Sequence, residues 1–521
     1  MQNHPDNTVE FGARHYLSIF TIFTLLGFSV FAAFDLALAD ELTLRLRDIV
    51  LEKFDWLFVF TVTLVLISVI ALIAHPGAAM KLGKDDEEPE FSRLSWFSML
   101  FSAGLGSGLL YWGTAEPIIH FGTNPFAVME GLNPGSSQAA TQAITVTLFH
   151  WGLHGWGLYV IAALAIGLSA YRFNNPLTFS SALIPLFGKK LLSGKFGTVV
   201  DLIALYGTVF GMATSVGLTV GSMNATLEPL LGIKMTVYNQ VAIILAVSTL
   251  GVFSAVSGVQ NGIRRLSEFN IWLSLALLVI IVLLGPSLYL LSSIPVNLVD
   301  YAVNAIPMGF WISDSKDGLA WQGAWSIFYW GWWLAWTPFV ALFIARISRG
   351  RTVREFTLGV LLVPSLITVI WMSVFGGTAI HQEMVEPGVV SSVVNDNYAL
   401  GLIETIRGLN VPMLETPILV LVGLLLLTWL ITSLDSATLV VCHILHMDHI
   451  PAMKVFWGFI LGGVTCTLLL IGGITALQAA SIIIGLPMAI LVLLTLGSVV
   501  KMIFQYKQLA ASTEGQSEAV R

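Results

Sequence analysis

Residues 323–345 read GAWSIFYWGWWLAWTPFVALFIA, an apolar stretch that carries no charged side chain. A helix needs about 20 mostly apolar residues to cross the hydrocarbon core of a bilayer. The stretch is therefore predicted to be a membrane-spanning helix. Eleven similar stretches are found at 15–38, 54–75, 95–120, 142–170, 198–228, 236–257, 268–292, 356–377, 414–441, 454–474 and 477–503.

The composition of the whole chain agrees with this prediction. Of its 521 residues, 56% are hydrophobic and 11% are charged, whereas a soluble protein has about 25% charged residues. Such a small share of charge excludes a soluble multidomain enzyme and indicates a lipid bilayer as the main surrounding. The net charge of -7 is spread over loops and tails, so no nucleic-acid partner is expected. The predicted fold class is an all-α polytopic membrane protein with twelve transmembrane helices.

The basic residues predict the orientation of the chain. Cytoplasmic loops of membrane proteins carry an excess of Lys and Arg. If the N-terminus is placed inside, most of the 24 Lys and Arg residues fall on the cytoplasmic side. We therefore expect a multi-pass protein of the cell (inner) membrane with both termini cytoplasmic: a tail at 1–13, a membrane domain at 14–503 and a short tail at 504–521.

Three glycines interrupt the predicted third span, which contains FSAGLGSGLLYWGTAEP (101–117). Gly104, Gly106 and Gly108 stand at alternate positions, and no strand precedes them as a nucleotide-binding loop requires. Small residues in a span allow close packing of helices. Alternatively, they mark an unwound segment whose carbonyls face a ligand or ion. The sequence leaves both interpretations open.

Tryptophans dominate the predicted eighth span. Trp330, Trp333 and Trp336 recur every three residues and are expected to share one helix face, with Trp332 pointing elsewhere. An aromatic belt at the membrane surface is the alternative, but belts lie at the ends of spans. Pro338 lacks a backbone N–H and is expected to break the helix just after Trp336.

The predicted fourth span holds a second aromatic group in FHWGLHGWGLY (149–159). A quaternary ammonium group has no N–H to donate, so a protein holds it against the faces of aromatic rings, worth about 2 kcal/mol when water is excluded. Trp151, Trp156 and Tyr159 could form such a cage with the tryptophans of the eighth span. Rings that only fill a helical core are the alternative.

The predicted tenth span contains WLITSLDSAT (429–438), with adjacent hydroxyls at Thr432 and Ser433 and an acid at Asp435. Oxygen ligands suit hard cations, and acids inside a membrane usually have a partner or handle ions. Hydroxyls that bond to the carbonyl four residues earlier are the alternative. His150 and His154 are four residues apart, but no third metal ligand accompanies them.

These motifs together resemble the betaine/choline/carnitine transporter family. FYWGWWLAWTPF (328–339) followed by ARISRGRTVREF (345–356) is close to the family signature, and the other motifs occur in the family's order and spacing. The resemblance covers roughly residues 14–503. It implies a leucine-transporter-like architecture: two extra helices, then inverted five-helix repeats at about 95–292 and 323–503, usually in a homotrimer.

The resemblance also implies roles for individual residues. The aromatic cage consists of Trp151, Trp156, Tyr159 and Trp333, near a pathway lined by Trp330, Trp332 and Trp336, with Gly104, Gly106 and Gly108 beside the substrate. The hydroxyls of Thr432 and Ser433 ligate sodium together with carbonyls of Ser102, Leu105 and Trp429. The family also has a second sodium site, of which this chain retains Thr208 and Phe339. Met212 stands where a second threonine is expected, and a thioether is a poor ligand for a hard cation.

The implied function is sodium-coupled import of a quaternary-ammonium zwitterion such as glycine betaine. Choline-type members tend to carry Asp where this chain has Gly108, which favours a zwitterion. A proton-coupled choline importer or an exchanger of the same family is the alternative, and carnitine, dimethylsulfoniopropionate and ectoine remain possible substrates. A channel would need a repeated filter motif, and the sequence contains none. The sequence also contains no catalytic constellation, so neither enzymatic activity nor a cofactor other than the coupling ion is expected.

Overall fold

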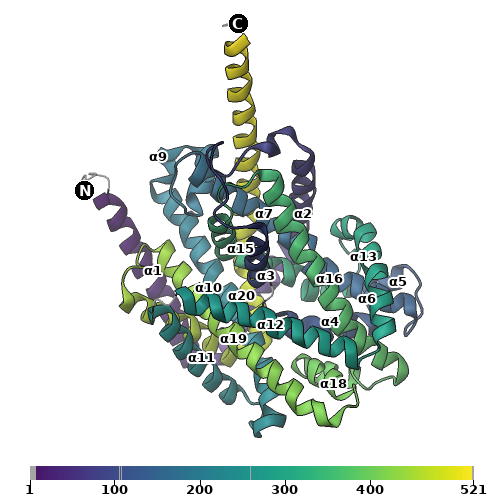
Figure 1. The fold of residues 1–521 in the computed structure, drawn as a ribbon. Coiled ribbons are helices and arrows are strands. Elements are labelled where there is room, and N and C mark those ends of the chain that lie inside the picture. The colour runs from purple at the N-terminus through teal and green to yellow at the C-terminus, as the bar shows by residue number, and fades with distance from the viewer. Residues whose placement is uncertain (1–6, 105, 107, 258–259, 519–521) are drawn as a thin grey trace.

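The computed structural model describes residues 7–518 except 105, 107 and 258–259, and it leaves out the side chains of 7–16, 101–104, 260–265 and 506–518. The described chain is built of helices (Figure 1), and its one β-type contact is an isolated antiparallel bridge between Lys81 and Thr352. Among the described residues, ten helical segments are long and apolar enough to cross a membrane. The prediction of an all-α polytopic membrane protein is confirmed.

Most long helices overlap the predicted spans. The first part of the chain forms α1 (Asn7–Phe34), α2 (Leu36–Ala74), α3 (Arg93–Gly104), α4 (Gly108–Gly122), α6 (Ser137–Trp151), α7 (Leu153–Gly167), α10 (Lys195–Leu231), α11 (Val237–Ser257), α12 (Gln260–Leu284) and α13 (Ser287–Gly309). The second part forms α15 (Phe328–Ile347), α16 (Val353–Val385), α19 (Pro412–Ile444) and α20 (Pro451–Glu518). Short helices connect them: α5 (Pro125–Met129), α8 (Ile184–Phe187), α9 (Lys189–Leu192), α14 (Lys316–Gln322), α17 (Ser391–Asp396) and α18 (Gly401–Arg407). Helix α2 begins well before the predicted 54–75, and α13 lies largely outside any predicted span.

Two glycine interruptions agree with the sequence. Helix α3 ends at Gly104 and α4 begins at Gly108, and the described Gly106 lies outside both, so the third span is interrupted at its glycines. That the carbonyls of this segment face a ligand or ion stays a prediction. Helix α20 is divided by Gly472 and Gly473, and Gly473 has φ 60 and ψ -135. Only glycine adopts such backbone angles readily, so the kink separates the two predicted spans at 454–474 and 477–503.

The prediction of a break after Trp336 is wrong. Helix α15 continues through Pro338 to Ile347. Proline is tolerated inside a membrane helix that its neighbours enclose, and α15 packs against α7, α10 and α20. The irregularity lies before the tryptophans instead, in a π-helical turn at Gly323–Ile327.

Another break falls where none was expected, within the aromatic motif of the fourth span. Gly152 has φ -105 and ψ -130 and separates α6 from α7. The Tyr301 hydroxyl of α13 accepts a hydrogen bond from the Leu153 N–H at 2.7 Å, and a side chain at Gly152 would collide with it. The predicted seventh span, 268–292, is also interrupted, because α12 ends at Leu284 and α13 begins at Ser287.

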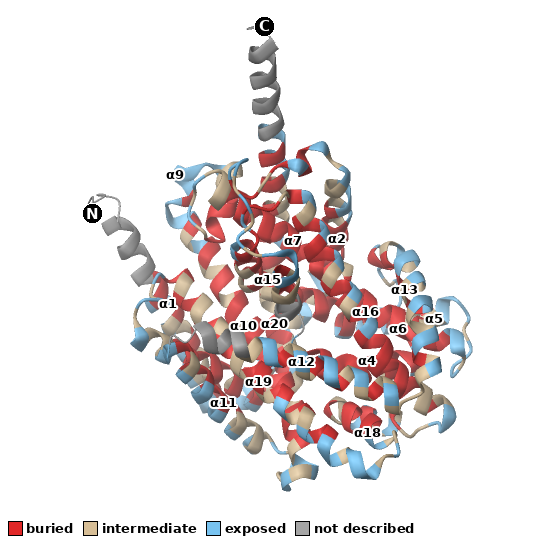
Figure 2. Ribbon diagram, in the orientation of Figure 1, coloured by how far each residue is buried: buried red, intermediate tan, exposed pale blue. Residues whose placement is uncertain are grey.

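The aromatic motifs lie at the centre of the helical body. Helix α20 packs against α2, α7, α10, α11, α15 and α19, while α15 also packs against α7 and α10. The segments with the largest buried shares are Ser137–Arg172 and Lys316–Ile347, which carry the two groups of aromatic residues. Exposed residues are frequent on outer helices such as α11 (Figure 2). The exposed residues include large apolar side chains, for example Phe34, Phe253 and Leu288. Such a surface is suited to contact with lipid.

Helix α3 is held in place by the loops around it. Arg351, in the loop between α15 and α16, stacks at 4.1 Å over the Trp96 ring of α3 and donates to Glu355 at 2.8 Å. Asp85, in the loop before α3, accepts a hydrogen bond at 2.7 Å from Arg172, which follows α7, and this contact lowers the pKa of the Asp85 carboxyl. These contacts attach α3 to the ends of α15 and α7, the helices that carry the aromatic residues.

Candidate functional site

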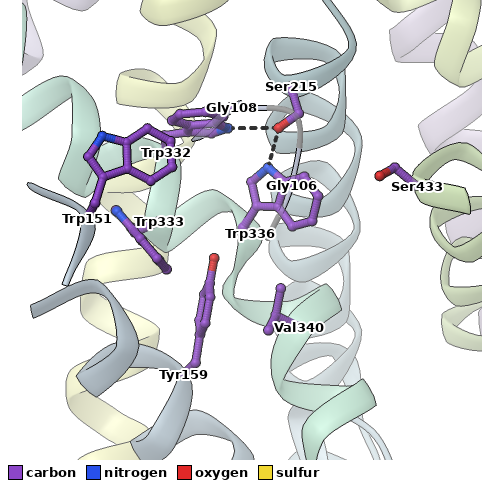
Figure 3. Close-up of a pocket in the computed structure, with 10 residues that line it drawn as sticks. All are labelled: Gly106, Gly108, Trp151, Tyr159, Ser215, Trp332, Trp333, Trp336, Val340 and Ser433. Carbon is purple, nitrogen blue, oxygen red and sulfur yellow. Dashed lines mark hydrogen bonds between the residues drawn. The ribbon is translucent and has the colours of Figure 1, made fainter. Parts of the chain in front are cut away.

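A cavity of about 80 Å³ lies between α7, α10 and α15, beside the break that separates α3 from α4 (Figure 3). Five of its ten lining residues are aromatic. It is lined by Gly106, Gly108, Trp151, Tyr159, Ser215, Trp332, Trp333, Trp336, Val340 and Ser433, which we call the aromatic pocket. The described lining residues include no charged side chain.

Trp333 contacts three other aromatic rings at this pocket. Its centroid lies 5.0 Å from that of Tyr159, 5.8 Å from that of Trp156 and 6.4 Å from that of Trp151. Trp156 lies behind this group with 1% of its surface exposed. The four residues that sequence analysis assigned to a cage are therefore brought together, although Trp156 supports the pocket without lining it.

The tryptophans of α15 take a different arrangement from the predicted one. Trp332 lines the pocket together with Trp333 and Trp336, whereas Trp330 packs against Phe149 and His154 away from it. Successive residues of a helix are about 100° apart, so Trp336 lies between Trp332 and Trp333 around the axis. The prediction that Trp332 points elsewhere is wrong, because the pocket covers a broader sector of α15 than one face.

The indole N–H groups bond to the wall and not to the pocket interior. Trp332 and Trp336 both donate to the Ser215 hydroxyl of α10, at 3.1 and 2.9 Å. Trp333 donates to the backbone carbonyl of His150 at 2.9 Å. Ser215 was missed because a lone serine in an apolar span gives no specific signal. With the polar edges used in this way, the ring faces are left for a ligand.

A larger cavity of about 520 Å³ adjoins the aromatic pocket, and we call it the vestibule. The two cavities share Gly106, Trp336, Val340 and Ser433. Farther along, the vestibule is lined by polar residues near the ends of α15, α19 and α20. These are Arg346, His443, Asp448 and Lys454. The pocket therefore connects to a wider, more polar space on one side.

Three of the predicted sodium ligands line the vestibule, and one of these also lines the aromatic pocket. Ser433 lines both cavities, and Thr432 and Trp429 line the vestibule. The Thr432 hydroxyl donates to the carbonyls of Thr428 and Trp429, each at 3.0 Å, as the local alternative anticipated. The lone pairs of the Thr432 hydroxyl oxygen remain available to coordinate a cation. Leu105 and the side chain of Ser102 lie outside the described part of the chain.

The two residues retained from the second sodium site, Thr208 and Phe339, lie in different surroundings. Thr208 is buried and donates to the Ala204 carbonyl at 3.0 Å. Phe339 lines the vestibule, 5.1 Å from the Trp336 ring, whereas Thr208 is not among the lining residues of either cavity.

Asp435, the acid of the tenth-span motif, links two helices, since Ser254 of α11 donates a hydrogen bond to it at 2.5 Å.

Comparison with known proteins identifies the family. The family model described as "BCCT, betaine/carnitine/choline family transporter" matches residues 16–508. The chain belongs to this family. Membership confirms the resemblance in the motifs and the expectation that the protein is a transporter and not an enzyme.

Curated relatives of this transporter carry related names. It is 36% identical to the glycine betaine transporter of Acinetobacter baylyi, over 92% of this chain and 72% of the relative. It is 37% identical to a glycine betaine transporter of Bacillus subtilis, over 86% of each. It is 35% identical to the high-affinity choline transport protein of Escherichia coli K12, over 88% of this chain and 67% of the relative.

Sequence analysis of the transporter missed one buried group beside the pocket. Glu116 of α4, within the quoted GTAEP, accepts hydrogen bonds from Trp151 at 2.8 Å and from the Tyr329 hydroxyl at 2.5 Å. His150 lies 2.6 Å from the same carboxylate. His154, four residues after His150 in the sequence, packs against Phe149 and Trp330 instead. A single acid in an apolar span was the available signal.

Proposed function

We propose that this protein is a secondary transporter that imports a glycine betaine-like zwitterion across the cytoplasmic membrane, coupled to sodium. The observation that carries this proposal is the aromatic pocket. Its ring faces surround the cavity, its indole N–H groups are used by the wall, and its described lining has no charged side chain. Ring faces attract a cation that has no hydrogen to donate.

A zwitterion is favoured over free choline by the crowding at Gly108. A side chain there would approach both the Trp151 and Trp332 rings to 2.9 Å. The Asp that choline-type members carry at this position would have to displace one of these rings. Names of relatives include both glycine betaine and choline transporters, so the choice rests on this site.

Sodium coupling is supported by the place of Ser433 and Thr432. Two adjacent hydroxyls lie at the junction of the pocket and the vestibule, near the unwound segment around Gly106. Backbone carbonyls of an unwound membrane helix and side-chain oxygens are suitable ligands for a hard cation. An ion there would touch the elements that form the pocket, which is what coupling requires.

We further propose the family architecture of twelve spans, with repeats at about 95–292 and 323–503, in a homotrimer of the inner membrane with both termini cytoplasmic. Leaving out α13, which is not among the helices apolar enough to cross a membrane, and counting α3 with α4 as one span, α6 with α7 as one, and α20 as two at its kink gives this number. In this orientation Arg346 and Lys454 lie on the cytoplasmic side, so the vestibule opens inward and the described state is inward-facing.

A binding screen tests the function directly. The purified transporter is heated with glycine betaine, carnitine, choline, dimethylsulfoniopropionate or ectoine, each with sodium or with potassium. We expect glycine betaine to raise the unfolding temperature most, and more in sodium, because a ligand that binds the native state stabilises it. Labelled glycine betaine should enter proteoliposomes only with an inward sodium gradient. Uptake driven equally by a proton gradient in potassium would contradict the coupling.

Gly155→Ala is expected to raise the KM for glycine betaine about tenfold. The added methyl group would lie 2.3 Å from the Trp333 ring, so this ring must move. A displaced ring loses part of its interaction with the cation, which is worth about 2 kcal/mol. Gly157→Ala is the matched control, since the nearest atom to a methyl group added there is the Leu66 Cα, at an ordinary contact distance of 3.6 Å. Uptake kinetics in proteoliposomes would contradict the prediction if both variants had the parent KM.

A further inference from the structure

The buried carboxylate of Glu116 has no role in the transport site described so far. It lies on α4, is fully buried, and is not among the lining residues of the aromatic pocket or the vestibule. Acids are costly inside a membrane protein and are kept where they have partners or a function. The question is therefore what its partners do.

One carboxylate oxygen holds two aromatic residues at the pocket. Oε2 of Glu116 accepts from the indole N–H of Trp151 at 2.8 Å and from the hydroxyl of Tyr329 at 2.5 Å. Trp151 lines the pocket, and the Tyr329 ring contacts it at a centroid distance of 5.3 Å. Hydrogen bonds to a carboxylate are shorter and stronger than those between neutral groups. The indole is thus held at its edge, with its ring directed to the cavity.

The other oxygen reaches a second ring of the pocket through His150. Oε1 of Glu116 lies 2.6 Å from Nδ1 of His150, whose Nε2 lies 3.0 Å from the Ser326 hydroxyl. The backbone carbonyl of His150 accepts from the indole N–H of Trp333 at 2.9 Å. Fixing His150 between Glu116 and Ser326 therefore fixes the carbonyl that holds Trp333.

This support is needed because Trp151 is the last residue of a helix. Helix α6 ends at Trp151, directly before the break at Gly152. The last turn of a helix lacks part of its backbone hydrogen bonding. A ring attached there is less constrained by its own helix than Tyr159 or Trp333, which lie within α7 and α15. A contact from a third helix, α4, compensates for this.

A metal site is the competing use of the same atoms. Glu116, His120 and His150 have potential ligand atoms within 4.8 Å of one another. The 2.6 Å between Oε1 and Nδ1 is a hydrogen-bond length, whereas ligands of a tetrahedral zinc ion, each about 2.0 Å from the metal, are about 3.3 Å apart. The observed geometry favours the hydrogen-bonded arrangement.

We propose that Glu116 is a positioning residue of the aromatic pocket: it orients Trp151 directly, and Trp333 by way of His150. The proposal rests on the proposed function, in which these rings hold the cation of the substrate. It predicts that what the pocket needs at position 116 is a hydrogen-bond acceptor for the indole of Trp151.

The test is a double-mutant cycle on the full-length transporter, with the Kd for glycine betaine measured by calorimetry in sodium. Glu116→Ala should raise the Kd about tenfold or more. In a Trp151→Phe background, which has no indole N–H, the same change should raise the Kd less than about threefold. Equal effects of Glu116→Ala in both backgrounds, or an unchanged Kd, would overturn the proposal.

Glu116→Gln keeps an acceptor in the same place and should bind within about threefold of the parent. This variant decides the matter if Glu116→Ala is not recovered folded, since a tenfold loss in folded Glu116→Gln would overturn the proposal. The matched control is Glu383→Gln, a buried carboxylate bonded to Gly388, Val390 and Ser391, which should leave the Kd unchanged. One bound metal ion per chain, found by elemental analysis, would also overturn it.

Ligand-free unfolding temperatures separate this proposal from the proposed function. If Glu116 holds Trp151, the shifts caused by Glu116→Ala and Trp151→Phe are not additive even without substrate. A parent that binds no quaternary ammonium compound would refute the function while the cycle of unfolding temperatures still tested the contact. Additive shifts in a transporter that binds glycine betaine would refute the positioning role alone.

Discussion

Trp333→Leu is expected to raise the KM for glycine betaine uptake tenfold or more. The Trp333 ring lies 5.0 Å from that of Tyr159 and 6.4 Å from that of Trp151 between centroids, and Trp333 lines the pocket. A desolvated ring face contributes about 2 kcal/mol to holding a cation, and about 1.4 kcal/mol corresponds to a factor of ten in affinity. Leucine keeps the apolar bulk but has no such face. Initial rates of labelled uptake into proteoliposomes measure the effect.

The control for this variant is Trp457→Leu. Trp457 is fully buried in α20 but is not among the lining residues of either cavity. Its replacement should lower the unfolding temperature through lost packing and leave the KM unchanged. Should Trp333→Leu transport with the parent KM, the rings would be packing elements and the assignment of the pocket to a cation would have to be given up.

Replacing both Thr432 and Ser433 with alanine is expected to abolish sodium-stimulated uptake while the protein remains folded. The two hydroxyls lie where the pocket meets the vestibule, and alanine offers a cation no ligand there. Folding should tolerate the change, because the Thr432 hydroxyl bonds only to carbonyls of its own helix among the described residues. Uptake with sodium and with potassium gives the measurement, and the elution volume in detergent reports the fold.

Thr438→Ala provides the comparison on the same helix. Its hydroxyl also returns to a carbonyl of α19, that of Leu434 at 2.7 Å, but it lines neither cavity among the described lining residues. Sodium stimulation should survive this change. Because Met212 stands where a second site needs an oxygen, the Hill coefficient for sodium in the parent should be near one. A coefficient near two, or full stimulation in the double variant, would contradict the single-site proposal.

The class of protein could be predicted from the sequence because it depends on quantities that tertiary packing does not alter. A chain with 11% charged residues cannot cover its surface with charge, so its apolar stretches had to face lipid. The glycines at 104, 106 and 108 and at 472 and 473 interrupt helices, as their intrinsic freedom suggests. Pro338 did not, because α15 is packed against α7, α10 and α20 and continues as a helix through the proline.

The composition of the pocket could be predicted, but its geometry could not. The aromatic residues of the fourth and eighth spans do meet, because α7 packs against α15. Which tryptophans face the cavity depends on the rotation of α15 about its axis. That rotation is set by the hydrogen bonds of Trp332 and Trp336 to Ser215 of α10 and by the packing of Trp330 against Phe149. No periodicity within α15 contains this information.

Glu116 and Gly152 show most clearly what the tertiary structure alone decided. The break at Gly152 is stabilised by a hydroxyl of Tyr301, far away in the chain, that takes the Leu153 N–H. Glu116 of α4 acquires its partners only when α4, α6 and α15 meet, since His150 and Trp151 belong to α6 and Tyr329 belongs to α15. The sequence by itself determined that the chain crosses a membrane and contains the rings for a cation. Contacts between distant segments determined how those rings are held, because a hydrogen bond across helices depends on their arrangement in space.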